Sequence, residues 1–232
     1  RLHKTGFDKK EPIILLHYAN IRKTEGFYDD ARTFYELYAE AVPDDPRGQA
    51  GLQSLDMIEE WLEFPSKYEV EYIKKISSRQ SDFCPTYASD NFNDLIFTST
   101  RDGATGKKTD EWTDQNFSDL FTTRIDRKGE WAEPTLLDNS EEGINTEANE
   151  GAAVMDSRYS TLYFTRCPNE DKKINGCQIY TSRRTGRIWS KPEMVKLSND
   201  SSDAFGHPAI SENELIIYFT SDREGGFGGN DI

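Results

Sequence analysis

Two cysteines carry the most specific chemistry in the sequence. Cys167 and Cys177 stand ten residues apart, on either side of the polar stretch 168–176, which has the composition of a hairpin loop. Strands paired across such a loop would bring the two thiols within disulfide reach, which indicates an oxidising compartment. The alternatives are two unrelated thiols or half of a zinc site, although no nearby CxxC or histidine pair completes four ligands. We expect the disulfide, no metal site, and a third cysteine, Cys84, buried as a small apolar residue.

Other reactive residue types occur without the partners that catalysis needs. The chain has three histidines; His207 could contact a ligand, although a hydrogen-bonded structural role suits a lone histidine better. No GxSxG elbow, HExxH helix or P-loop is present. The glycine-rich run 225–229 opens no helix, so we expect a tight loop there rather than a phosphate site. The aspartate-rich run 199–203 lacks the pattern of an EF-hand and is expected to be a solvated loop. The sequence predicts no catalytic or cofactor-binding residue, and hence no enzyme.

Composition narrows the class of partner. The net charge is −14 over 232 residues, which disfavours nucleic acid and anionic lipid. A hydrophobic share of 35% with 12% aromatic residues suits a repeat architecture, in which each unit buries a thin layer against its neighbours. No apolar run is long enough to span a membrane. Because the sequence opens at Arg1 and stops at Ile232 within a predicted strand, we expect it to be part of a longer protein.

The N-terminal part, residues 1–66, predicts paired helices. Two runs with helical spacing fill residues 12–43, with Gly26 between them and Pro43 at the end of the second. The apolar residues of the runs are Ile14, Leu15, Tyr18, Ala19 and Ile21, then Tyr28, Ala31, Phe34, Tyr35 and Tyr38. The period and the small residues at 19 and 31 resemble a tetratricopeptide repeat, about 34 residues long. Residues 46–62 predict a further helix with Leu52, Leu55, Ile58 and Trp61 inward, and residues 1–11 the tail of an earlier repeat.

The remainder, residues 67–232, predicts strands. Val70, Tyr72 and Ile76 alternate with charged residues as on a half-buried strand. A pattern of four short strands then recurs. The copies run through residues 83–87, 95–99, 119–122 and 129–131; then 150–154, 162–165, 178–181 and 186–189; then 206–210 and 217–221. Trp131 and Trp189 are 58 residues apart, a spacing typical of β-propeller blades, and we expect them to wedge between adjacent blades. About two and a half blades do not close a ring.

The third copy ends in residues 219–232, Phe-Thr-Ser-Asp-Arg-Glu-Gly-Gly-Phe-Gly-Gly-Asn-Asp-Ile. This run resembles the TolB-type propeller repeat of Bacteroidetes envelope proteins, with residues 98–103 a looser copy, whereas Arg166 and Cys167 break the pattern in the second copy. Helical repeats that lead into such blades are similar to the PorE-type proteins of the type IX secretion system. In that family a lipidated N-terminus precedes the repeats, and an OmpA-like peptidoglycan-binding domain ends the chain.

The resemblance implies an α + β multidomain protein that works as a non-catalytic scaffold. Its place would be the periplasm, at the outer membrane, and its partners other envelope or secretion proteins. Peptidoglycan would be bound only through a domain that this sequence does not contain. The alternative is the propeller of a prolyl-oligopeptidase-like hydrolase with a catalytic domain beyond Ile232, and a glycan-binding propeller is a third option. A GxSxG elbow further along the chain would favour the hydrolase.

Overall fold

The computed structural model describes residues 10–106, 109–110, 113–138, 143–167, 176–200 and 202–232. The chain divides into two compact units, residues 1–70 and 71–232. The first contains three α-helices and the second a series of antiparallel sheets, so the fold class is α + β. The expected tail of an earlier repeat in residues 1–11 falls largely outside the described residues.

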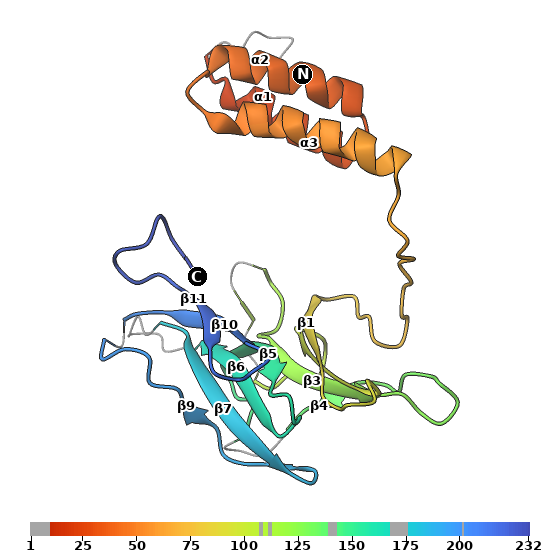
Figure 1. Cartoon of the computed structure of the whole chain (residues 1–232), viewed down its shortest axis with the longest axis vertical. Coiled ribbons are helices and arrows are strands. Elements are labelled where there is room, and N and C mark those ends of the chain that lie inside the picture. Colours follow the sequence, from red (N-terminus) through yellow and green to blue (C-terminus); the bar gives the residue numbers. More distant parts are fainter. Residues whose placement is uncertain (1–9, 107–108, 111–112, 139–142, 168–175, 201) are drawn as a thin grey trace. The chain divides into compact units, whose positions relative to one another are not determined.

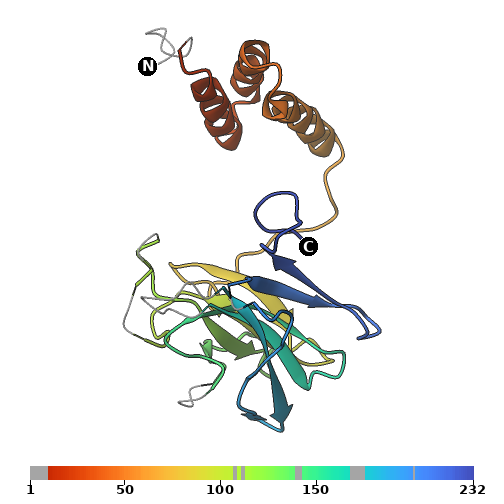
Figure 2. The ribbon, with the colours of Figure 1, turned by 90° about the vertical axis from the view of Figure 1, so that its left-hand side faces the viewer.

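Three helices lie side by side in the first unit (Figures 1 and 2). They are α1 (Ile13–Thr24), α2 (Tyr28–Ala41) and α3 (Pro46–Glu63). Gly26, at φ +80°, makes the turn between α1 and α2 in a conformation that glycine adopts without strain. Asp45 caps α3 by accepting a bond from the backbone N–H of Arg47 at 3.0 Å, and Pro46 occupies the first helical position, which needs no donor.

Small residues let these helices approach closely. Ala19 and Ala31 are fully buried, as the repeat pattern predicts, and Tyr35 and Tyr38 fill the space around them. The inward prediction for Trp61 is wrong, because its side chain is 58% exposed. Two apolar residues of the first run, Tyr18 and Ile21, are also partly exposed, although the ring of Tyr18 packs edge-on against that of Phe34 at 4.5 Å between centroids.

We predict that Gly51→Ala destabilises the helical unit by about 1–2 kcal/mol, although alanine favours helices. A Cβ atom at Gly51 would stand 2.8 Å from the Cγ atom of Tyr35 and closer still to two further atoms of its ring. That ring cannot swing away freely, because its hydroxyl donates to Asn20 at 2.6 Å. Far-UV circular dichroism during urea unfolding measures the effect. Gln53→Ala, on the exposed face of the same helix, is the control, and equal midpoints for the two variants would contradict the prediction.

The strand predicted around Val70 is absent. Residues 64–73 form no ladder, and the side chains of Val70 and Tyr72 are 99% and 75% exposed. Alternation alone does not make a strand, because the backbone groups need a partner strand. Ile76 is buried, but in a turn that packs on Phe97 and Phe121.

The second unit consists of three successive antiparallel sheets, which Figure 2 shows one after another along the chain. The first contains β1 (Asp82–Tyr87), β2 (Asp94–Ser99), β3 (Asp119–Arg124) and β4 (Thr135–Leu136), in that order. The second contains β5 (Asn149–Met155), β6 (Thr161–Cys167), β7 (Gln178–Thr185), β8 (Ile188–Trp189) and β9 (Glu193–Met194), with β8 and β9 both paired to β7. The third contains β10 (Phe205–Ile210) and β11 (Ile217–Ser221).

The first strand of every sheet carries the same irregularity. The pairing register shifts after Phe83 in β1, after Gly151 in β5 and after Gly206 in β10. The next residue in each strand has a positive φ: 48° at Cys84, 46° at Ala152 and 53° at His207. A β-bulge at one position in three strands is a built feature of the repeat.

The outer strands match the prediction only in part. Of the two stretches expected, 186–189 contains β8, which pairs with the end of β7, whereas 129–131 forms no strand. The ladder partners of Phe121 and Tyr180 are Leu136 and Met194, five residues beyond the tryptophans. Trp131 forms only an isolated bridge, with Ile125. Pro134 and Pro192 explain the offset, because proline lacks the N–H that a ladder requires.

Candidate functional site: the junction between the first and second sheets

Each junction between sheets repeats one hydrogen bond. The N–H of Ala152, in the bulge of β5, donates to the hydroxyl of Thr98 on β2 at 3.0 Å. The N–H of His207, in the bulge of β10, donates to Thr165 on β6 at 2.9 Å. The bulge frees an N–H from its own sheet, and the threonine of the preceding sheet accepts it.

This contact explains why the residue before the bulge is a glycine in the second and third sheets. A Cβ atom at Gly151 would stand 2.9 Å from the methyl carbon of Thr98, and one at Gly206 would stand 3.3 Å from that of Thr165. The corresponding residue of the first sheet is Phe83, which is 42% exposed. In the described part of the chain, no threonine of another sheet approaches it. The spacing of the copies predicted the repeat, whereas this interlocking became visible only in three dimensions.

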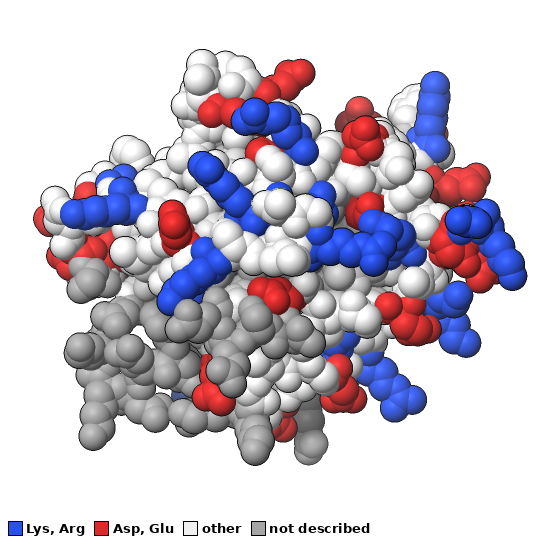
Figure 3. All heavy atoms as spheres, turned by 90° about the horizontal axis from the view of Figure 1, so that it is seen from below, with Lys and Arg blue, Asp and Glu red and all other residues white. Residues whose placement is uncertain are grey.

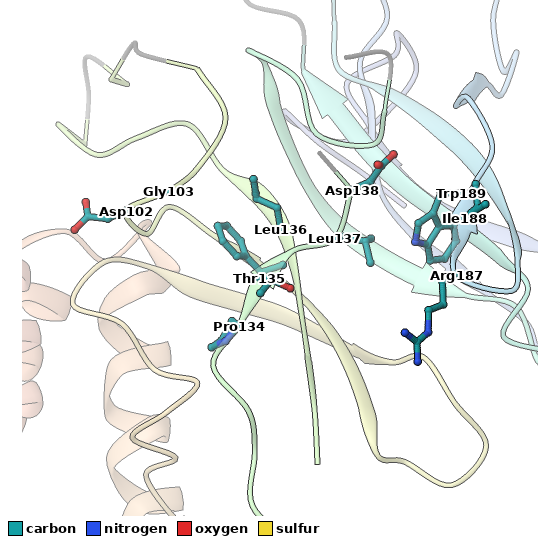
Figure 4. Close-up of a pocket in the computed structure, with 11 residues that line it drawn as sticks. Asp102, Gly103, Pro134, Thr135, Leu136, Leu137, Asp138, Arg187, Ile188 and Trp189 are labelled. Atoms are coloured by element: carbon teal, nitrogen blue, oxygen red, sulfur yellow. The ribbon is translucent and has the colours of Figure 1, made fainter. Parts of the chain in front are cut away.

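A groove lies beside this junction, between β4 and the β7–β8 hairpin, with a volume of about 730 Å³ (Figure 4). Leu136 and Leu137 line one side, and Ile188 and Trp189 line the other. A second hollow of about 500 Å³ shares Leu137 and Trp189 with it. The two hollows therefore adjoin one another, and their walls combine apolar side chains with polar and charged ones.

Trp189 lines the groove and packs against the hydrophobic cluster at the junction between the first and second sheets. Its ring packs on the cluster that joins Ile96 and Leu120 of the first sheet to Leu162 and Phe164 of the second. The guanidinium of Arg184 lies 5.4 Å from the ring centroid. Arg184 also donates to the carbonyl oxygens of Ala88 at 3.0 Å and Tyr159 at 2.7 Å, so it ties the two sheets together.

Trp131 takes the corresponding face of the first sheet, but it does not lie between two sheets. It packs with Phe97, Phe121 and Leu136, and the turn residue Ile76 covers this cluster. Wedging between blades is therefore wrong for Trp131 within the described residues.

The charged residues of the groove lie apart from one another. Its carboxylates, Asp102 and Asp138, come from separate segments, and Asp102 lies at the opposite end from Arg187 (Figure 4). In the segments that the structure describes, no group of three histidine, cysteine or acidic residues could hold a metal. Ile188 is 76% exposed at the rim and offers an apolar contact to a partner.

The first and second sheets also share a buried charged cluster that the sequence did not reveal. Asp119, at the start of β3, and Glu150, on β5, are both fully buried. Arg166 donates to Glu150 at 2.7 Å, and Thr146 donates to it at 2.6 Å. One oxygen of Asp119 accepts the backbone N–H of Thr105, while the other, Oδ1, has no donor.

Burial and crowding shift both carboxyl groups. Burial, and to a smaller extent the neighbouring Glu150, raises the pKa of Asp119 to about 7, although the bonds from Thr105 oppose this shift. Burial likewise raises the pKa of Glu150, although its bonds to Thr146 and Arg166 oppose this. A proton held between two such carboxyls would supply the donor that Asp119 Oδ1 lacks.

Each sheet also places an arginine on a pair of aromatic rings. The guanidinium of Arg101 lies 4.9 Å from the centroid of Phe97 and 5.2 Å from that of Phe121. Arg166 lies 5.5 Å from Phe164 and 4.7 Å from Tyr180. Arg166, which breaks the sequence pattern of the second copy, therefore restores the same contact from a different position along the strand.

The cysteines and the histidine that the sequence singled out have structural surroundings rather than reactive ones. Cys167 and Cys177 form the expected disulfide, with S–S 2.08 Å and Cα–Cα 4.0 Å, and residues 168–175 of the predicted loop lie outside the described residues. Cys84 is half-buried rather than buried, and burial raises the pKa of its thiol. His207 contributes its backbone N–H to the junction, while its side chain is exposed, so the prediction of a hydrogen-bonded histidine is not met by the ring.

The structure also describes the two runs that the sequence predicts to be loops. Residues 222–230 make a tight turn after β11, with Gly225 at φ +104°, as expected for the glycine-rich run. In the aspartate-rich run, Asp200 accepts bonds from the N–H and hydroxyl of Ser202 at 2.9 and 2.7 Å, and Ser201 lies outside the described residues.

Among the described residues, no helix is both long and apolar enough to cross a bilayer. A scan against models of protein families found no match to this chain, and a search of curated proteins found no similar sequence.

Proposed function

We propose that this chain is part of a non-catalytic, protein-binding scaffold that works outside the cytoplasm. In this proposal the sheets are consecutive blades of a β-propeller, and the helices form a tetratricopeptide-type repeat. The observation that carries it is the repeated junction, in which a threonine of one sheet accepts the bulge N–H of the next, at Thr98 with Ala152 and at Thr165 with His207. An interlocking unit that can be added many times builds large rigid surfaces, which suit protein binding.

Location and pathway follow from two further observations. The Cys167–Cys177 disulfide is consistent with an extracytoplasmic place, since such bonds persist in oxidising compartments. The order of helical repeat and propeller, together with the glycine-rich run 225–229, resembles the PorE-type proteins. We therefore propose the periplasmic side of the outer membrane as the location and components of type IX secretion as the first partners to test.

The groove between β4 and β8 is the proposed contact surface. Acidic and basic side chains are mixed over the face that Figure 3 presents, with no patch of a single sign. Such a face fits a protein partner better than a polyanion. The exposed side chain of Ile188, beside the ring of Trp189, gives this surface an apolar contact at the rim of the groove.

A substitution at the rim of the groove tests the proposal. The purified chain is immobilised, envelope proteins that bind are identified, and each one is purified and titrated by calorimetry. Ile188→Asp should weaken saturable binding at least tenfold, because it replaces the exposed apolar contact of the surface with a charge. Leu215→Asp, at a residue 82% exposed in the turn between β10 and β11, is the matched control. If no envelope protein binds saturably, or if both variants bind equally well, the proposed role of the groove is wrong.

A further inference from the structure

The disulfide lies at the point where the second sheet contacts the start of the third. Arg166 on β6 and Gln178 on β7 form the last pair of their ladder, and the disulfide joins the next residue of each strand, Cys167 and Cys177. The backbone carbonyl of Cys177 accepts the N–H of Phe205, the first residue of β10, at 2.7 Å. The cross-link therefore fixes the carbonyl group to which the start of β10 is bonded.

The residues on either side of Cys177 also contact the segment that leads into β10. A Cβ atom at Gly176 would stand 2.5 Å from the carbonyl oxygen of Asp203 and 2.7 Å from the Cα atom of Ala204, so the two backbones lie in direct contact. The side-chain amide of Gln178 donates to the same carbonyl oxygen of Asp203 at 2.8 Å. Residues 176–178 thus act together as the surface that positions β10.

The first junction makes the corresponding contact without a cross-link. Ser118 directly precedes β3, as Cys177 directly precedes β7, so the two residues correspond. The carbonyl of Ser118 accepts the N–H of Glu150 on β5 at 2.8 Å. Asn149 reinforces this contact, because its side-chain oxygen accepts the N–H of Ser118 at 2.9 Å and its hydroxyl at 3.2 Å.

The second junction lacks this side-chain support. Ala204 stands two residues before Gly206, as Asn149 stands two residues before Gly151, and alanine has no side-chain oxygen to accept a bond. Here the disulfide holds Cys177 instead, from within the second sheet. Because a disulfide can be reduced and the hydrogen bonds of Asn149 cannot, the two junctions should respond differently to a reductant.

We propose that the Cys167–Cys177 disulfide is a redox-sensitive lock on the junction between the second and third sheets. In the oxidised protein it holds residues 176–178 against the start of β10. In the reduced protein the start of β10 is released, while the junction between the first and second sheets stays closed. The lock goes beyond the proposed function and does not depend on which partner the groove binds.

A dithiol is the reductant that this step requires. One of its thiolates attacks a sulfur of the disulfide, forms a mixed disulfide and releases the other cysteine, which takes up a proton. The second thiol of the reductant then attacks the mixed disulfide, frees the remaining cysteine and leaves with the first as an internal disulfide. Two electrons and two protons pass to the protein. Cys167 and Cys177 are both half-buried rather than enclosed, which leaves them open to such an attack.

Amide exchange followed by NMR tests the lock, with dithiothreitol as the dithiol and Cys84→Ser as the background, so that no third thiol takes part. Reduction should speed exchange at the Phe205 amide about tenfold or more, because the cross-link no longer opposes local opening of the junction. Exchange at the Glu150 amide, the corresponding donor of the first junction, should change less than about twofold.

A double variant, Cys167→Ala with Cys177→Ala in the same background, completes the test. Its Phe205 amide should exchange as in the reduced protein, with or without dithiothreitol. Equal exchange at Phe205 in the oxidised and reduced protein would overturn the proposal. So would equal acceleration at Phe205 and Glu150, because the disulfide would then support the whole unit, and so would a disulfide that dithiothreitol leaves intact in the folded protein. Each of these failures is separate from the loss of an envelope partner at Ile188.

Discussion

Arg166→Ala should lower the free energy of unfolding of the β unit by about 3–5 kcal/mol, because it leaves the buried carboxylate of Glu150 without its charge partner. Glu150 is fully buried, and Arg166 is the cation that contacts it. The same guanidinium donates to the carbonyl oxygens of Gly143 at 3.0 Å and Ile144 at 2.9 Å. One substitution therefore removes the charge partner of Glu150 and the donor for two carbonyls that lead into β5.

Urea unfolding followed by near-UV circular dichroism measures this loss. Arg183→Ala, which removes an exposed arginine from the same sheet, should change the free energy by less than about 0.5 kcal/mol. Glu150→Gln in the Arg166→Ala background should recover more than half of the loss, since the stranded charge is then gone. If Arg166→Ala costs no more than Arg183→Ala, the ion pair does not stabilise the junction as the structure indicates.

The sequence predicts those parts of the fold in which a local pattern decides the outcome. The positions of the sheets follow from the repeated alternation of apolar residues in three copies, and the helices from spacing and from the breaks at Gly26 and Pro43. The disulfide follows from two cysteines on either side of one loop. In these cases the residues that form an element are close together along the chain.

Prediction from the sequence fails where the structure or burial of a residue depends on a neighbour that is distant along the chain. Val70 and Tyr72 alternate as strand residues do, but no strand pairs with them, and Trp61 has the spacing of a buried residue on a face that nothing covers in the described part of its unit. The candidate site was missed for the same reason. Asp119 and Glu150 are 31 residues apart and belong to different copies of the repeat, so no motif brings them together. One clue was present: each is an acidic residue at the start of a predicted strand, 119–122 or 150–154.

The buried carboxyl pair predicts that the stability of the β unit falls as the pH rises from about 4 to about 7. Folding raises the pKa of Asp119 from its ordinary value near 3.8 to about 7. Between these two values the folded state holds a proton that the unfolded state has released, so stabilisation is complete below about pH 4 and is lost through pH 7. Glu150, whose pKa is also raised, acts in the same direction.

Asp119→Asn should remove most of this dependence of stability on pH and stabilise the β unit at pH 8 by about 2–4 kcal/mol relative to the parent. The amide oxygen can still accept the N–H of Thr105, and the amide N–H₂ supplies to Glu150 the donor that two carboxylates lack. Urea midpoints measured from pH 4 to pH 8 give the comparison, with the exposed Asp90→Asn as the matched control. A parent protein that is more stable at pH 8 than at pH 5, with the Asp119→Asn variant following the same curve, would show that the two carboxyls do not share a proton. A flattened curve for Asp119→Asn alone would place the titrating proton at the junction of the first two sheets, where Arg166 balances only one of the two charges.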